Sequence, residues 1–224
     1  MGVVSTNVQG IRQRIASACG RCARDPKSVL LIAVSKLRAG REIRAAYGAG
    51  IRDFGENRVK EALGKREVFP KNCRLHMVGH LQSNKAREAI ALFDVIHSVD
   101  SVELAQKISK CAKDAGKIQQ ILLEVNISGE PSKQGFSPNE VVGAAREISA
   151  LSNAKLVGLM AMAPLHPNPE TARLVFRKLR GLRDSIRQET GLELPHLSMG
   201  MTDDFEVAIE EGATMLRVGR AIFD

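Results

Sequence analysis

Residues 30–36 read Leu30-Leu31-Ile32-Ala33-Val34-Ser35-Lys36, and this stretch decides how the rest of the chain is interpreted. Five consecutive apolar residues are typical of a strand that is buried on both faces, as in an all-parallel sheet. Lys36 comes almost directly after that run. A lysine at the end of a buried strand is either a solvated strand end or an amine held beside a pocket. Position alone favours the solvated end, so the choice depends on the other strands.

Seven more stretches are predicted to be strands, at 51–54, 75–78, 94–99, 120–127, 156–162, 194–197 and 213–218. Apolar residues at helical spacing separate them, and one more helix is predicted at 6–23, before the first strand. Strict alternation predicts a parallel α/β sheet, and eight units predict closure into a single (β/α)8 TIM barrel. The helix at 6–23 then completes the outer ring. An open doubly wound sheet is the alternative, but no G-x-G-x-x-G motif follows any predicted strand.

Capping residues predict where several helices begin. Ser83 or Asn84 is expected to cap a helix at 85–92, and the stretch Ser137-Pro138-Asn139-Glu140 is a capping box with proline at the first helical position. A further helix is predicted at 203–211. No linker or low-complexity run interrupts the pattern, so residues 1–224 are expected to form one domain.

Composition narrows the class of protein. The 224 residues carry a net charge of +8, which raises nucleic acid as a partner. The 33 Lys and Arg residues are dispersed, however, and one Tyr with no Trp gives little material for base stacking. The excess charge suits anionic small ligands instead. No apolar run approaches ~18 residues and the N-terminus lacks a signal-peptide pattern, so no membrane span and a cytoplasmic location are expected.

The four cysteines do not predict a metal site. Cys19 and Cys22 form a C-x-x-C motif, but no second pair follows it, so a zinc site with four ligands is unsupported. The motif also lies within the helical pattern of 6–23 rather than after a strand, unlike the redox motif of thioredoxins. These cysteines are interpreted as small residues on a helix face.

In a barrel, the residues that follow the strands gather at one end, where barrel proteins place their chemistry. The polar, glycine and sulfur-containing residues at those positions are Lys36, Asn57, His80, Asn84, Asn126, Met160, Ser198, Gly200, Arg217, Gly219 and Arg220. Ser198-Met199-Gly200-Met201-Thr202 offers a hydroxyl, a glycine and a helix N-terminus, which together favour a phosphate. The alternative is an ordinary turn capped by Thr202, but Arg217-Val218-Gly219 on the next strand makes anion binding the better hypothesis.

A phosphate site after the seventh and eighth strands faces Lys36 across the barrel mouth. That separation suits pyridoxal 5′-phosphate, whose aldehyde forms a Schiff base with a lysine while its phosphate is anchored. Burial of Lys36 is expected to favour the uncharged amine that attacks the aldehyde. Lys133, in the loop after the fifth strand, is a second and weaker candidate acceptor, with a solvated loop lysine as the alternative.

Several segments resemble the pyridoxal-phosphate homeostasis proteins of the YggS/PROSC family. They are Ala33-Val34-Ser35-Lys36, Phe54-Gly55-Glu56-Asn57, Gly79-His80-Leu81-Gln82-Ser83-Asn84-Lys85, Gly158-Leu159-Met160, Leu197-Ser198-Met199-Gly200-Met201 and Arg217-Val218-Gly219. The resemblance runs from about residue 8 to the C-terminus, and it implies a barrel similar to the N-terminal domain of alanine racemase. The chain departs from the family pattern at Arg58, at Thr202 and in ending at Phe223-Asp224.

The resemblance also implies roles for residues. It makes Lys36 the aldimine lysine and assigns Ser198, Gly219 and Arg220 to the phosphate, the last two through backbone N–H groups. Asn57, Met160 and Gly200 are expected in the same cofactor-binding set. Arg217 is expected beside the pyridine nitrogen, where a cation disfavours protonation of the ring.

Three functions compete. The leading hypothesis is a protein that holds pyridoxal phosphate and manages its intracellular supply without turnover, as a monomer that serves recipient pyridoxal-phosphate enzymes. The alternative is a pyridoxal-phosphate-dependent amino-acid racemase, which needs an acid–base group on each face of the cofactor. Tyr47 lies in the first predicted outer helix after Lys36, so His80, whose competing role is to cap a turn, is the only nearby candidate. The third, a nucleic-acid binder, rests on net charge alone.

Overall fold

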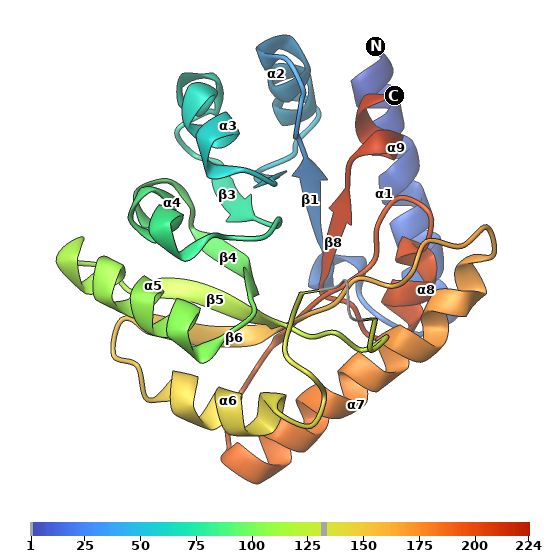
Figure 1. The fold of residues 1–224 in the computed structure, drawn as a ribbon. Helices are drawn as coiled ribbons and strands as arrows, with labels where there is room; N and C mark the ends of the chain where they lie inside the picture. The colour runs from blue at the N-terminus through green and yellow to red at the C-terminus, as the bar shows by residue number, and fades with distance from the viewer. Residues whose placement is uncertain (1, 131–133) are drawn as a thin grey trace.

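A computed structural model describes residues 2–130 and 134–224 as a closed barrel of parallel strands surrounded by helices (Figure 1). The strands follow one another around the barrel in chain order, so the predicted (β/α)8 fold is confirmed. They are β1 (Leu30–Val34), β2 (Asp53–Glu56), β3 (Arg74–Met77), β4 (Val95–Val99), β5 (Gln119–Glu124), β6 (Ala154–Met160), β7 (His196–Ser198) and β8 (Met215–Val218).

The apolar run at 30–34 is the strand that closes the barrel. β1 pairs with β2, where Val34 lies opposite Gly55, and with β8, where Ile32 lies opposite Arg217. Because all eight strands run in parallel, their carboxyl ends meet at one end of the barrel. The residues that follow β1, β2 and β8 are therefore neighbours in space.

Helices form the outer layer. They are α1 (Val3–Arg21), α2 (Gly40–Gly48), α3 (Val59–Gly64), α4 (Ala86–Leu92), α5 (Val102–Asp114), α6 (Val141–Ser149), α7 (Arg173–Thr190), α8 (Phe205–Glu210) and α9 (Arg220–Phe223), with 3-10 turns η1 (Pro26–Ser28), η2 (Arg66–Val68), η3 (Ser83–Lys85) and η4 (Pro169–Ala172). Helix α1 buries Val8, Ile11, Ile15 and Ala18 at intervals of three or four residues, which places them on one face. It packs beside α2, α8 and α9, so the N-terminal helix completes the ring as predicted (Figure 1).

Two predicted helix starts need correction. Neither Ser83 nor Asn84 caps a helix, because both lie in η3 and α4 begins only at Ala86. Helix α8 begins at Phe205 rather than 203, because the Asp204 carboxylate accepts a hydrogen bond from the Met201 backbone N–H at 2.6 Å and closes a turn there.

The predicted capping box is present in part. The Glu140 carboxylate accepts hydrogen bonds from the N–H and the hydroxyl of Ser137, at 3.2 and 2.6 Å. The regular helix α6 nevertheless begins one residue after the box, at Val141. Proline at 138 therefore lies in the turn before the helix rather than at its first position.

The buried residues divide between two places. Most apolar side chains lie between the strands and the helices, including Phe54, Phe176 and Phe205. A smaller apolar cluster lies apart from that layer and takes its members from five of the strands. Its members are Ile32, Val95, Leu122, Val157, Met160 and Met215. The strands bury polar side chains as well, including those of His76 and His97. No helix in the described part of the chain is long and apolar enough to cross a membrane.

Candidate functional site

A cavity of about 770 Å³ opens at the carboxyl ends of the strands. That volume is in the range of small-molecule sites, and its place is the one where barrel proteins bind ligands. Five of the eight predicted site residues line it, namely Lys36, Asn57, Arg217, Gly219 and Arg220. The structure thus brings the ends of β1, β2 and β8 together, along with the loops after β6 and β7.

Lys36 lies at the cavity with an exposed side chain. No hydrogen bond or ion pair reaches its amine from the residues that the structure describes. The prediction that Lys36 is buried is wrong, because β1 ends at Val34 and the chain turns outward at Lys36 and Leu37. The amine is available to a ligand because it is unengaged, not because it is desolvated.

The backbone on both sides of Lys36 is held firmly. The Ser35 hydroxyl donates a hydrogen bond to Glu56 Oε1 at 2.7 Å, and Lys65 Nζ donates to the Ser35 carbonyl at 2.9 Å. On the other side, the Leu37 backbone N–H donates to Glu61. Leu37 has a φ of 60°, a left-handed conformation that a non-glycine residue keeps only when neighbouring contacts enforce it.

These contacts come from a cluster of Glu56, Glu61 and Lys65, which we call the ion cluster. Lys65 Nζ lies 2.7 Å from Glu56 Oε1 and 2.9 Å from Glu61 Oε1. Glu56 is fully buried, and its second oxygen has no hydrogen-bond partner among the described residues. Burial raises the pKa of the Glu56 carboxyl, although the bonds from Lys65 and Ser35 oppose that rise.

The sequence interpretation misses the ion cluster as a support for Lys36. It includes Glu56 only as part of a family segment, although an ionisable residue that ends a fully buried strand needs a partner. The signal is present at α3, where Glu61 and Lys65 are four residues apart and therefore share a helix face. The sequence does not show that this helix face contacts Glu56.

Arg217, on the β8 strand that pairs with β1, forms another part of the cavity wall, and the residue is only 5% exposed. Its guanidinium donates to Ser198 Oγ at 2.7 Å and to the Ala161 carbonyl at 3.0 Å, two neutral acceptors. Burial lowers the pKa of Arg217 to about 10, and the Glu124 and Asp204 carboxylates oppose the decrease. Arg217 therefore presents a positive charge to the cavity at neutral pH.

Three predicted site residues do not line the cavity. Ser198 is fully buried, and its hydroxyl contacts Arg217 and His97 Nδ1, at 2.7 and 2.8 Å. Met160 belongs to the small apolar cluster of the barrel. Gly200 has a φ of 92°, and a Cβ there would lie 2.6 Å from Ala208 Cβ. The requirement for glycine at 200 therefore comes from its backbone and from packing against α8.

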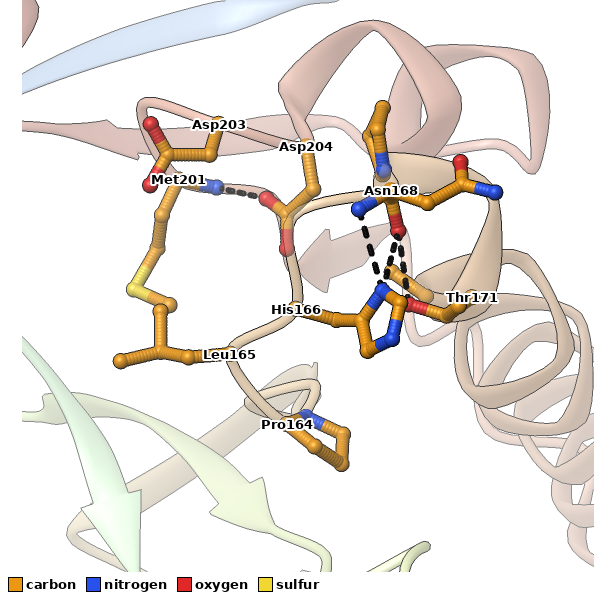
Figure 2. Close-up of a pocket in the computed structure, with 10 residues that line it drawn as sticks. Pro164, Leu165, His166, Asn168, Thr171, Met201, Asp203 and Asp204 are labelled. Atoms are coloured by element: carbon orange, nitrogen blue, oxygen red, sulfur yellow. Dashed lines mark hydrogen bonds between the residues drawn. The ribbon is translucent and has the colours of Figure 1, made fainter.

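The loop after β7 is tied to its surroundings beside a smaller pocket that adjoins the cavity (Figure 2). Arg220 forms an ion pair with Asp203, and Thr202 Oγ1 accepts a hydrogen bond from the Ala221 N–H at 3.4 Å. As Figure 2 shows, the Met201 N–H is engaged by Asp204. This N–H group belongs to the turn that the sequence predicts to favour a phosphate, and it already has a partner.

The other candidates that the structure describes do not line the cavity. His80 is half exposed, and its Nδ1 is 3.1 Å from Asp100 Oδ2. Asn84 is exposed within η3. The Asn126 side chain accepts from the Gly129 N–H at 3.0 Å and so holds the loop after β5. Lys133 lies outside the described residues.

Comparison with known proteins places this geometry in a family. The family model "Alanine racemase, N-terminal domain" matches residues 7–224. A pyridoxal phosphate homeostasis protein of Aquifex aeolicus is 42% identical over 214 residues, which cover 95% of this chain and 94% of that protein.

Solved structures agree with these matches. PipY of Synechococcus elongatus PCC7942, solved with and without PLP, is 39% identical, and the match covers 96% of this chain and 100% of PipY. The TM-scores are 0.84 with PLP bound and 0.86 without it. An alanine racemase of Clostridium difficile, 16% identical over 97% of this chain and 56% of its own, shares the fold with a TM-score of 0.76. The chain belongs to the pyridoxal phosphate homeostasis protein family, which is built on the alanine racemase N-terminal domain.

Proposed function

We propose that this chain binds pyridoxal 5′-phosphate in the cavity between Lys36 and Arg217, and that it serves the intracellular supply of the cofactor rather than its use in a reaction. The observation that carries the proposal is an unengaged lysine amine, on a fixed backbone, that shares one cavity with a buried cation. When bound, pyridoxal phosphate supplies an aldehyde that condenses with an amine. The names of the relatives support the same assignment.

The residues present fit this ligand. The cavity of about 770 Å³ has room for it, and Arg217 and Arg220 give the wall the positive charge that a phosphate ester favours. Gly219 lines the cavity, and a Cβ added there would lie 3.3 Å from the Val34 carbonyl oxygen, so the chain after β8 passes close to the end of β1 at the cavity wall.

We assign direct contacts to Lys36, Asn57, Arg217, Gly219 and Arg220. Ser198, Met160 and Gly200 support them from beneath the cavity rather than at its wall. The whole chain acts as one pyridoxal-phosphate-binding unit, because β1, β2 and β8 supply these contacts together.

The geometry favours a binding protein over the racemase alternative. Carbanion chemistry needs a positioned acid–base group on each side of the substrate, worth roughly 10²–10⁴ in rate. Lys36 is one such group, but Tyr47 lies on α2, where its hydroxyl bonds to Asn72, and His80 is paired with Asp100. Asp203 also lines the cavity, but its carboxylate forms an ion pair with Arg220. An Arg217 held by neutral acceptors also opposes protonation of a ligand nitrogen placed near it.

Two experiments test this function. Titration of the purified protein with pyridoxal phosphate should give a new near-visible absorbance, and borohydride reduction with peptide mapping should place the modification on Lys36. Holo-protein incubated with single L-amino acids in deuterated water should then show no more Cα exchange than free cofactor does. Exchange well above that level would make the chain an enzyme and favour the racemase.

Assembly and partners are part of the same proposal. A single chain supplies the five direct contacts, so we propose that the monomer is the binding unit and that it serves recipient pyridoxal-phosphate enzymes. Sedimentation of the loaded protein should give the mass of one chain. The cytoplasmic location stays a prediction from the sequence.

A further inference from the structure

A continuous line of hydrogen bonds runs through the barrel from the wall of the cavity. Arg217 Nη1 is 2.7 Å from Ser198 Oγ, and Ser198 Oγ is 2.8 Å from His97 Nδ1. His97 Nε2 is 2.9 Å from His76 Nδ1, and His76 Nε2 is 3.0 Å from Asp53 Oδ1. We call these five residues the interior chain. They come from β8, β7, β4, β3 and β2, so no local stretch of sequence contains them.

The interior chain is buried along its length, and its far end reaches solvent through one side chain. Each of its five residues is at most 5% exposed. Asp53 Oδ1 also accepts from Arg74 Nε at 2.7 Å, and Arg74, the first residue of β3, has a side chain 57% exposed. No group of three or more His, Cys, Asp or Glu side chains in the described ranges could hold a metal ion. The histidines therefore act as hydrogen-bonding groups.

The direction of the hydrogen bonds follows from Asp53. Burial raises the pKa of Asp53, but the bonds from His76 and Arg74 outweigh it and lower that pKa, so Asp53 is an ionised acceptor. His76 must then carry a proton on Nε2, and as a neutral ring it accepts at Nδ1. His97, whose pKa burial lowers well below its ordinary range, is neutral, so it donates from Nε2 and accepts at Nδ1.

The same direction extends to Arg217. With His97 Nδ1 as an acceptor, the Ser198 hydroxyl donates to it and its oxygen is left to accept from Arg217. The reverse direction would set the lone pair of His76 Nε2 against the Asp53 carboxylate and leave the Ser198 hydrogen without an acceptor. A buried donor without a partner is costly, so one direction is favoured along the whole chain.

We propose that Asp53, His76 and His97 are positioning residues that orient the Ser198 hydroxyl and thereby fix the guanidinium of Arg217 on the wall of the cofactor cavity. This inference rests on the proposed function, since the cavity is where the cofactor binds. The interior chain ends in a neutral hydroxyl, so it fixes the place of the guanidinium without cancelling its charge. The ligand chemistry that this arrangement suits is an acceptor atom, such as an unprotonated ring nitrogen or an anionic oxygen, held by a rigid donor.

The first test uses the wild-type protein without cofactor. Nitrogen-15 spectra of the imidazole rings should show His76 and His97 as neutral Nε2–H tautomers. The Arg217 guanidinium should give separate signals for its two terminal nitrogens, because two hydrogen bonds slow its rotation. A proton on His97 Nδ1, or a freely rotating guanidinium, would overturn the proposal without any statement about cofactor binding.

The second test breaks the interior chain. His97→Leu and Ser198→Ala should merge the terminal signals of Arg217, shift the absorbance of bound pyridoxal phosphate, and weaken its affinity roughly tenfold, the scale of one hydrogen bond to a charged group. His196→Asn is the matched control, because His196 lies on β7 and its ring hydrogen-bonds to Thr214, while no hydrogen bond joins the ring to the interior chain among the described residues. It should change none of these readouts.

The outcomes separate the two proposals. If the wild-type protein fails to bind pyridoxal phosphate but shows the expected tautomers and slow guanidinium, the proposed function fails and the positioning of Arg217 stands. If binding is normal and His97→Leu folds but leaves affinity, absorbance and the Arg217 signals unchanged, the positioning role is refuted. Should His97→Leu not fold, Ser198→Ala and the wild-type spectra still decide.

Discussion

Lys36 and Arg217 are two cations that face one cavity, and the protein places them in opposite ways. The Lys36 side chain is exposed and unengaged among the described residues, while its flanking backbone is fixed. The Arg217 side chain is buried and bonded at two nitrogens. An amine that must form and release a covalent bond needs freedom to move, whereas a guanidinium that sets the local charge needs a defined place. The two arrangements match these two requirements.

The residues that support Lys36 are charged, whereas the groups that bond to Arg217 are neutral, and the same two requirements explain this difference. The ion cluster of Glu56, Glu61 and Lys65 contacts the Ser35 and Leu37 backbone, so its charges fix the chain and leave the Lys36 amine without a carboxylate partner. Arg217 is bonded by neutral oxygens. A carboxylate bonded directly to Arg217 would form an ion pair and reduce the field in the cavity.

The largest effect is expected from removing the amine. Lys36→Ala should abolish the near-visible absorbance of the loaded protein and the borohydride-stable modification, because no other lysine lines the cavity within the described residues. Non-covalent binding should remain, since Arg217 is untouched. Lys60→Ala, an exposed lysine on α3, is the control and should behave as the wild type. A modification that persists in Lys36→Ala would move the attachment to another lysine, with Lys133 the first to map.

The next largest effect should come from the ion cluster. Lys65→Met leaves the Glu56 carboxylate buried without its cation, and breaking a buried pair in this way costs about 3–5 kcal/mol. Urea unfolding at neutral pH measures that loss, which should shrink in acid because Glu56 can then be protonated. Lys60→Met on the same helix should change stability by less than about 0.5 kcal/mol. Equal stability of the Lys65 and Lys60 variants would contradict a structural role for the ion cluster.

A pH series compares two buried carboxylates, Glu56 in the ion cluster and Asp53 in the interior chain. The pKa of Glu56 is raised above its ordinary value of 4.5, so its contribution to stability is present below that value and lost as pH rises through the folded pKa. The pKa of Asp53 is lowered below 3.8, so its contribution is present above that value and lost as pH falls through the folded pKa. Each unit of displacement amounts to about 1.4 kcal/mol.

Amide variants test these signs. Glu56→Gln should gain stability relative to the wild type between pH 4 and neutral pH, because the penalised charge is gone. Asp53→Asn should lose stability relative to the wild type as pH rises from about 3 to 5. Denaturant midpoints across that range measure both differences. Parallel trends in the two variants would mean that the environments of these carboxylates are not opposite.

The barrel and much of the cavity could be predicted from the sequence because both depend on regular patterns. Strand–helix alternation predicts where strands end, and the ends of β1, β2 and β8 hold Lys36, Asn57 and Arg217. The exposure of Lys36 could not be predicted, because it depends on the path of two residues after the strand. Gly200 is predicted to serve a ligand, although its φ and the nearby Ala208 explain it.

The interior chain escapes prediction for a different reason. The predicted site draws on residues at or after the carboxyl ends of strands, whereas Asp53 is the first residue of β2 and His76 lies within β3. Polar residues within predicted strands were the available signal, since His76 lies between Leu75 and Met77 and His97 follows Ile96. Which face each one occupies follows only from the register of the closed barrel, where Gly55 lies opposite His76. Their alignment across five strands is a tertiary property.

The smallest effect is expected from Arg220, a third cation on the same cavity. Its side chain is 65% exposed and forms an ion pair with Asp203, itself 53% exposed, so it resembles neither Lys36 nor Arg217. Exposed pairs of this kind contribute little, and Arg220→Ala should lower stability by less than about 1 kcal/mol. If Gly219 and Arg220 hold the phosphate through backbone N–H groups, the variant should weaken binding of pyridoxal phosphate by only a few-fold. That loss should decrease further in high salt, because salt screens exposed charges. Titrations at low and high ionic strength measure both effects. A loss greater than tenfold that persists in high salt would identify the Arg220 guanidinium itself as the phosphate anchor.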